Sequence, residues 1–142
     1  MLLVVLTPGL IVVGCSSHKQ TDTSASPNKS GSSSASAVMI TPEARQRAKE
    51  IFSFRCAACH GLQGRGDGPG AARLSPKPPN FNDSSWQQTI TDDEIEKVIV
   101  YGGAAVGKSP AMPANTDLQN DPAVVAALRE MIRQLGGRST AK

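Results

Sequence analysis

At 142 residues the chain is long enough for one small domain with appendages but too short for two. Its net charge of +3 is weak and no run of Lys and Arg occurs, so nucleic acid is a poor candidate partner. Three Phe, one Trp and one Tyr supply little large apolar surface, and a domain of this size is only marginally stable without additional help.

Residues 1–14 form an apolar leader. The run is too short to span a bilayer comfortably and fits the hydrophobic region of a secretory signal peptide. Its end resembles a bacterial lipobox, in which Cys15 becomes the lipidated first residue of the mature protein. No Lys or Arg precedes the apolar run, although signal peptides usually begin with a positive charge, so the true start is left open. The alternatives are an ordinary signal peptide and an uncleaved anchor.

Residues 15–40 are predicted to form a disordered tether that begins with the lipidated Cys15. Nine of the 25 residues 16–40 are serine, and such a segment cannot bury enough surface to offset its ordering entropy. The tether would hold a globular domain near a membrane, where stable attachment takes more than one acyl chain. His18 lies in this tether and is expected to be solvated.

The folded domain is predicted to span residues 41–138, followed by a frayed tail at 139–142. Thr41 fits a helix N-cap, with Pro42 at the first helical position. Apolar side chains then recur on one face of a helix that continues to Arg55: Ala44, Ala48, Ile51 and Phe52. This helix delivers the chain into a cysteine motif.

Residues 56–60 form a Cys-x-x-Cys-His motif, which is typical of covalent c-type haem attachment. Two thiols about one helical turn apart can each add to one vinyl group of the porphyrin, and the adjacent imidazole can ligate the iron. We therefore predict that Cys56 and Cys59 bind the haem and that His60 is an axial ligand. A buried porphyrin would also supply the apolar surface that the side chains lack.

Other interpretations of the motif fit less well. A zinc site needs four ligands, and outside the motif the chain offers only Cys15 and His18 as further Cys or His. A thioredoxin-like redox pair belongs near a βαβ pattern, whereas these cysteines follow a charged helical stretch. A pair of inert buried thiols would leave the adjacent histidine unexplained.

A glycine-rich loop follows the motif, with five glycines among residues 61–70. Glycine permits positive φ and close backbone approach, so we predict that the loop lies against the porphyrin edge; a flexible surface loop is the alternative. A ligating histidine usually donates its other N–H to a carbonyl or carboxylate. Pro69 is predicted to supply that carbonyl, with Pro79 as the second candidate, although both prolines could merely stiffen their loops.

Trp86 is the only tryptophan, and its indole N–H needs a partner if it is buried. Two interpretations of Trp86 stay open: its indole N–H donates to a haem propionate, or its side chain simply packs in the core. A capping box at residues 91–94 begins a helix that ends at Gly102-Gly103 and turns Ile95, Val98 and Ile99 inward. We interpret the acidic residues of this helix as a solvated face: Asp92, Asp93, Glu94 and Glu96.

Four methionines compete for the second axial position. A His and Met pair is common in electron-transfer haems and raises the reduction potential. Met1 lies in the leader, Met39 in the tether, and Met131 on the apolar stripe of the last helix. Met112 lies in a proline-braced loop and is the predicted ligand; the alternative is a hydrophobic plug over an open or water-bound iron.

Asp121-Pro122 begins the last helix, which carries a wide apolar stripe and ends at Gly136-Gly137. We predict that this helix packs against the first one and closes the fold around the haem.

Residues 41–137 resemble the class I, mono-haem cytochrome c family in its bacterial lipoprotein form. The motifs that carry the resemblance are Cys56-x-x-Cys59-His60-Gly61, Gly66-Asp67-Gly68-Pro69, Pro76-Lys77-Pro78-Pro79-Asn80-Phe81, Gly102-Gly103 and Met112-Pro113. The resemblance implies an all-α fold of three to five helices around one covalent haem, with the first and last helices packed together. It also implies one-electron transfer between redox partners, and haem attachment outside the cytoplasmic membrane.

We therefore expect an electron carrier and not an enzyme, tethered by Cys15 at the periplasmic or cell-surface side of the membrane and passing electrons between respiratory partners. Nucleic acid and small-molecule substrates are not expected. A fixed mono-haem subunit of a respiratory or dehydrogenase complex is the alternative, and an open-site haem enzyme or gas sensor is a further one. Basic loop residues are expected to steer docking to an acidic partner: Arg65, Arg73, Lys77 and Lys108.

Overall fold

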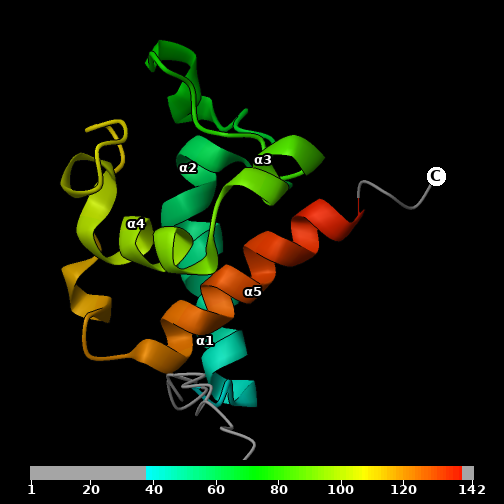
Figure 1. The fold of residues 1–142 in the computed structure, drawn as a ribbon, viewed down its shortest axis with the longest axis vertical. Helices are drawn as coiled ribbons and strands as arrows, with labels where there is room; N and C mark the ends of the chain where they lie inside the picture. The colour runs from blue at the N-terminus through cyan, green and yellow to red at the C-terminus, as the bar shows by residue number, and fades with distance from the viewer. Residues whose placement is uncertain (1–37, 139–142) are drawn as a thin grey trace, which may run out of the picture. The chain divides into compact units, whose positions relative to one another are not determined.

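The computed structural model describes residues 38–138, and all regular structure within this range is helical (Figure 1). The α-helices α1 to α5 span Pro42–Ile51, Ala57–His60, Ser84–Thr89, Asp92–Ala105 and Pro122–Arg138. The shorter segments η1, η2 and η3 span Phe52–Cys56, Pro69–Arg73 and Thr116–Leu118. The all-α prediction is thus confirmed. The predicted leader, Cys15 and His18, most of the tether and the tail at 139–142 lie outside the described residues.

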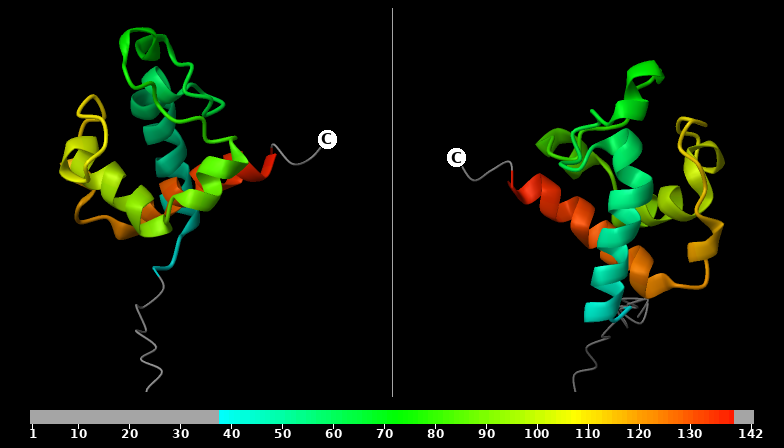
Figure 2. Two further views of the ribbon diagram at one scale, coloured as in Figure 1. Left: turned by 45° about the horizontal axis from the view of Figure 1, so that its top comes forward. Right: turned by 180° about the vertical axis from the view of Figure 1, so that it is seen from behind.

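Helix α1, the π-helix η1 and helix α2 form one continuous column (Figure 2). Thr41 is the N-cap of α1, since its hydroxyl accepts a hydrogen bond of 3.1 Å from the Ala44 N–H, and Pro42 occupies the first turn. The predicted start is therefore confirmed. The π-helical turn was not predicted; within it the Ala57 N–H bonds to the Phe52 carbonyl, five residues earlier.

The core lies where α1 crosses α5 (Figure 2), as the sequence predicts for the first and last helices. Leu118 and Leu128 are its most deeply buried large side chains, at 0% and 1% exposure. Two ion pairs flank the crossing, Arg45 with Glu130 at 3.2 Å and Arg47 with Asp121 at 3.1 Å. Further buried side chains come from both helices, from η1 and from α4: Ala44, Ala48, Ile51, Phe52, Ile95, Ile99, Val124, Ile132 and Leu135.

Helix α4 begins with the predicted capping box, in which the side chains and backbone N–H groups of Thr91 and Glu94 bond reciprocally. Ile95 and Ile99 are buried and Val98 is half-buried, as predicted. Regular helix is interrupted at Gly102, whose φ is 78°, although helical bonding resumes to Ala105. The predicted break at Gly102-Gly103 is therefore present, but the assigned helix extends two residues beyond it.

Helix α5 continues through both glycines that were predicted to end it, and reaches Arg138. Gly136 is buried against the side chain of Gln87, and a Cβ there would lie 2.6 Å from that side chain. Glycine at this position thus allows close packing and does not act as a stop. Within residues 38–138, no helix is both long and apolar enough to cross a membrane.

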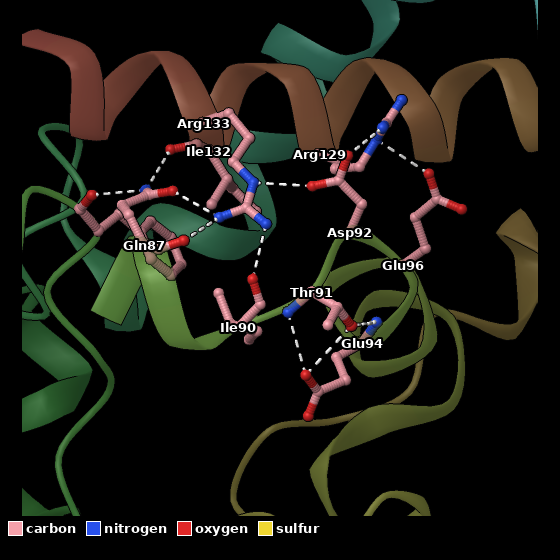
Figure 3. Close-up of polar contacts among 10 residues, drawn as sticks. Gln87, Ile90, Thr91, Asp92, Glu94, Glu96, Arg129, Ile132 and Arg133 are labelled. Atoms are coloured by element: carbon pink, nitrogen blue, oxygen red, sulfur yellow. Dashed lines mark hydrogen bonds and ion pairs between the residues drawn. The ribbon is translucent and has the colours of Figure 1, made fainter. Parts of the chain in front are cut away.

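Two of the acidic residues predicted to form a solvated face also connect α4 with α5 (Figure 3). Asp92 contacts both Arg129 and Arg133, and Glu96 pairs with Arg129 at 3.0 Å. Both carboxylates stay accessible to solvent, as predicted, with 48% and 39% of their side-chain surface exposed. Their ion pairs were not predicted, because the sequence had no means of placing α5 beside α4.

Candidate functional site

A cleft of about 360 Å³ opens between the α1–η1–α2 column, the segment before α3, helix α4 and the loop after it. Its lining is mainly apolar and brings together both cysteines of the motif, the adjacent histidine and one methionine. Residues that line the cleft include Arg55, Cys56, Cys59, His60, Leu74, Pro76, Lys77, Pro78, Pro79, Phe81, Trp86, Ile90, Ile95, Ile99, Lys108, Met112, Leu128 and Ile132.

The two thiols lie on consecutive helical segments, Cys56 at the end of η1 and Cys59 in α2. Both are half-buried and neither is in a disulfide. Burial raises the pKa of the Cys56 thiol to about 11, so it is protonated at neutral pH. The wider π-helical turn ends at Cys56 itself, so its geometry contributes to the direction in which both thiols face.

His60 is the last residue of α2 and is buried, at 8% exposure. Its ring stacks on Phe81, with centroids 4.6 Å apart and planes 17° from parallel. Burial lowers its pKa to about 4, which keeps the imidazole in the neutral form that ligates metals. Its Nδ1 is buried and has no hydrogen-bond partner among the described residues. A buried, neutral and unpartnered imidazole in the wall of an apolar cleft fits a ligand of haem iron.

The glycine-rich loop covers the end of α2 and does not line the cleft. The N–H groups of Gly66 and Gly68 donate to the carbonyls of His60 and Cys59, at 2.9 and 3.1 Å. These carbonyls belong to the last turn of a helix, which otherwise lacks backbone partners. Gly66 has a φ of 73°, and a Cβ there would lie 2.3 Å from the Pro78 carbonyl oxygen. The predicted conformational role is confirmed, whereas the position of the loop against the porphyrin edge stays a prediction.

The two candidate prolines are in different places. Pro69 begins the short helix η2 and is not among the cleft-lining residues, whereas Pro79 lines the cleft together with His60. Neither carbonyl accepts a hydrogen bond from the His60 Nδ1.

Met112 reaches the cleft on the loop that follows α4 and is half-buried. Its carbonyl accepts a hydrogen bond of 3.0 Å from the Gly103 N–H. A Cβ on Gly103 would lie 2.0 Å from the Ser109 carbonyl oxygen, and one on Gly102 would lie 2.8 Å from the Ala114 nitrogen. The glycine pair that ends regular helix in α4 therefore also makes room for the methionine loop.

Of the remaining predicted residues, Trp86 lines the cleft and the two other methionines of the described range do not. Trp86 is half-buried, lines the cleft and packs on Phe81 at 5.1 Å. Met131 packs against the core and Met39 is 82% exposed, and neither is among the residues lining the cleft.

Sequence reasoning missed two features of the cleft. Phe81 was noted only as part of a motif, yet it contacts both His60 and Trp86. Arg55 lines the cleft and bonds through Nη1 to both carboxylate oxygens of Asp117, at 2.8 and 3.1 Å. A large buried aromatic residue near the motif was a usable signal for Phe81, whereas nothing in the sequence pairs residues 55 and 117.

Comparison with protein families agrees with this geometry. The cytochrome c family model matches residues 45–135. Subunit CcoP of the cbb3-type cytochrome c oxidase of Rubrivivax gelatinosus is 33% identical over 92 residues, which are 65% of this chain and 27% of CcoP. The chain thus spans about a quarter of that relative. The c-type cytochrome KustC0563 is 24% identical, with a TM-score of 0.46, over 62% of this chain and 95% of its own.

The family match covers most of the domain and includes the Cys-x-x-Cys-His motif, which lies in the wall of an apolar cleft. A cytochrome c domain implies a covalent haem c and haem-based electron transfer. The chain therefore belongs to the cytochrome c family.

Proposed function

We propose that this domain is a one-electron carrier that binds one haem through Cys56 and Cys59, with His60 and Met112 as axial ligands. The observation that carries the proposal is that a single apolar cleft is lined by both thiols, the imidazole and the methionine thioether. When bound, haem c supplies the Fe(III)/Fe(II) couple, and the protein supplies ligands, burial and a docking surface.

Each residue contributes a distinct property. The thiols form thioether bonds that fix the porphyrin in the cleft. The buried imidazole remains neutral, and the thioether of Met112 favours the reduced iron, which raises the potential. Apolar side chains such as Ile95 and Ile99 exclude water from the cleft.

Two further residues support the bound group in this proposal. The His60 N–H would be held by the carbonyl of Pro69 or Pro79, since a ligating histidine usually donates its other N–H to such a group. Trp86 would face the porphyrin from α3, where its indole N–H can donate to a propionate.

The partner that we propose is an acidic redox protein, which is steered by exposed basic side chains of the loops. Arg65, Arg73 and Lys77 are exposed and have no ion-pair partner within residues 38–138. Lys108, by contrast, already faces Glu94 at 3.6 Å. Steering by the first three residues predicts that the rate of electron transfer to the partner falls as salt rises. A salt-independent rate would exclude this docking mode.

A fixed subunit of a membrane respiratory complex is the second candidate, because CcoP is by its name an oxidase subunit. In either case we propose a location outside the cytoplasmic membrane, with Cys15 lipidated and residues 15–40 as the tether. Mass spectrometry of the protein from its native membrane would test the lipid. Co-purification from detergent with larger subunits would favour the fixed subunit over the free carrier.

An optical spectrum and a redox titration of the protein matured by export and haem attachment test the central proposal. We expect a low-spin c-type spectrum and a weak red-region band from the Met112 sulfur to Fe(III), which disappears in Met112→Ala. Rapid CO binding by the reduced wild-type protein would instead indicate an open iron site, and a folded but colourless protein would refute haem binding altogether.

A further inference from the structure

A chain of contacts connects α5 with the imidazole of His60. Arg133 donates from Nη1 to the side-chain Oε1 of Gln87 at 2.8 Å (Figure 3). The Gln87 Nε2 donates to the Phe81 carbonyl at 2.8 Å, and the Phe81 ring stacks on His60. Arg133 and His60 are 73 positions apart in the sequence, yet only two residues separate them in this chain of contacts.

The amide of Gln87 is held in one orientation. Its Oε1 accepts from Arg133, while its Nε2 donates to the carbonyls of both Phe81 and Ile132. Gly136 lies directly against the same side chain, where a Cβ would be 2.6 to 2.7 Å away. Another orientation of the amide would break these bonds or collide with α5.

Arg133 is itself fixed from three directions. Its guanidinium donates to the backbone carbonyls of Gln87 and Ile90, both at 2.7 Å, and to the Asp92 carboxylate at 2.8 Å (Figure 3). The guanidinium thus connects the end of α3, the start of α4 and helix α5. An arginine with this many donors engaged keeps little freedom of rotation.

Phe81 is held at both ends of its backbone. Its N–H donates to the Gly64 carbonyl at 2.7 Å, and its carbonyl accepts from Gln87 at 2.8 Å. A Cβ on Gly64 would lie 3.0 Å from the ring and 2.7 Å from the Leu135 side chain, so the ring has little room on that side. A fixed backbone and confined space together set the plane of the ring that lies on His60.

We propose that Gln87, locked by Arg133, is a positioning residue that sets the plane of the His60 imidazole through Phe81. This inference rests on the proposed function of His60 as an axial ligand. Groups behind a metal ligand orient it and tune the metal. In ferric low-spin haem the orientations of the axial ligands, the imidazole plane among them, determine how the unpaired electron is distributed over the porphyrin, so the inference has a spectroscopic signature.

The test uses Gln87→Glu in the full haem-loaded protein. Glutamate keeps an acceptor for Arg133, but it lacks the N–H groups that hold the Phe81 and Ile132 carbonyls. We expect the order or spread of the haem-methyl proton resonances of the ferric protein to change, together with its EPR g values. Glu96→Gln is the control, because it weakens the Arg129 pair that holds α5 to α4 without contacting Gln87, which holds α5 to α3.

The inference is supported if Gln87→Glu alters the methyl pattern and Glu96→Gln does not. It is overturned if both variants keep the wild-type pattern, or if both alter it equally, since the effect would then come from general loosening of α5. Arg133→Lys keeps a positive charge for Asp92 but loses the guanidinium hydrogen bonds to the backbone and side-chain oxygens of Gln87. It should therefore shift the haem-methyl pattern in the same direction as Gln87→Glu. A wild-type ferric spectrum without histidine ligation would instead refute the proposed function itself.

Discussion

His60 and Met112 line the same cleft, but the chain holds them by different means. His60 ends a continuous helical column, and a buried aromatic ring and a hydrogen-bonded glutamine lie behind it. Met112 lies on a loop that is held to α4 mainly by hydrogen bonds to the backbone, including one of 2.7 Å from the Asn115 side chain to the Ile99 carbonyl. Two exposed ion pairs add to these bonds, Lys108 with Glu94 and Arg55 with Asp117. The imidazole side therefore depends on side-chain packing, whereas the thioether side depends on hydrogen bonding to a backbone that two glycines allow to approach closely.

The largest expected effect is the loss of stability when the Phe81 ring, which packs on the His60 imidazole, is removed. Phe81→Ala removes a buried ring that packs on His60 and Trp86, and such substitutions destabilise by about 3–5 kcal/mol. Urea unfolding of the haem-loaded protein, followed by circular dichroism, measures the loss. Phe81→Leu keeps much of the volume and should recover most of the stability. Equal losses in the two variants would contradict a role for packing volume at this position.

Gly103→Ala disturbs the loop that carries Met112. The new Cβ would lie 2.0 Å from the Ser109 carbonyl oxygen, so the methionine loop must move, at a cost of about 1–3 kcal/mol. We expect the Met-to-iron band to weaken or vanish while the histidine signature stays. Gly137→Ala is the matched control, because a Cβ there meets nothing within 4 Å. A normal band in Gly103→Ala would show that the loop does not need this close approach.

A smaller effect is expected from removing the ion pair between Arg55 and Asp117, which joins η1 to η3 just beyond the loop that carries Met112. Hydrogen bonding from Arg55 lowers the pKa of Asp117, so the pair is charged at neutral pH. Arg55→Gln or Asp117→Asn should let added imidazole displace Met112 more readily, by no more than a few-fold because the pair is exposed. The double variant should be no worse than either single one; additive effects would mean that the two residues act separately.

The smallest effect concerns pH and the contact between α4 and α5. Hydrogen bonding from Arg133 holds the pKa of Asp92 below its ordinary value of 3.8. Stability from this contact is therefore fully present above that value and is lost as pH falls through the lower pKa of the folded state. Because Asp92 is partly exposed, the loss should be at most about 1 kcal/mol. In Asp92→Asn, unfolding free energies measured across this range should lose that part of their pH dependence, whereas an unchanged profile would assign it to other carboxylates.

Local signals in the sequence predicted much of the fold. The Thr41 cap, the Thr91 capping box and the break at Gly102 each depend on residues that are neighbours in the chain. The motif predicted which side chains would meet at the cleft because its spacing is local and Met112 had few competitors. The crossing of the first and last helices followed from the apolar stripes that both carry.

What the sequence could not predict depends on pairs that are distant along the chain. Gln87 meets Arg133 across 46 positions, and nothing local marks either residue as more than a surface polar side chain. Gly136 looked like a helix stop because its packing against Gln87 arises only when α5 lies beside α3. That Pro79 and not Pro69 lines the cleft likewise depends on contacts between residues distant along the chain.

The π-helical turn at Phe52–Cys56 has a consequence for changes in chain length. Its widened bond spans five residues where an α-helix spans four, so the turn contains one residue more than regular helix would need. Deleting Ser53, which is exposed, would let the column close into uninterrupted α-helix. Because the π turn already accommodates the extra residue, both thiols and the imidazole would keep roughly their present facing while α1 kept its place on α5. The same deletion within α1, where regular helix would not absorb it, would instead rotate the motif by about 100° away from the cleft.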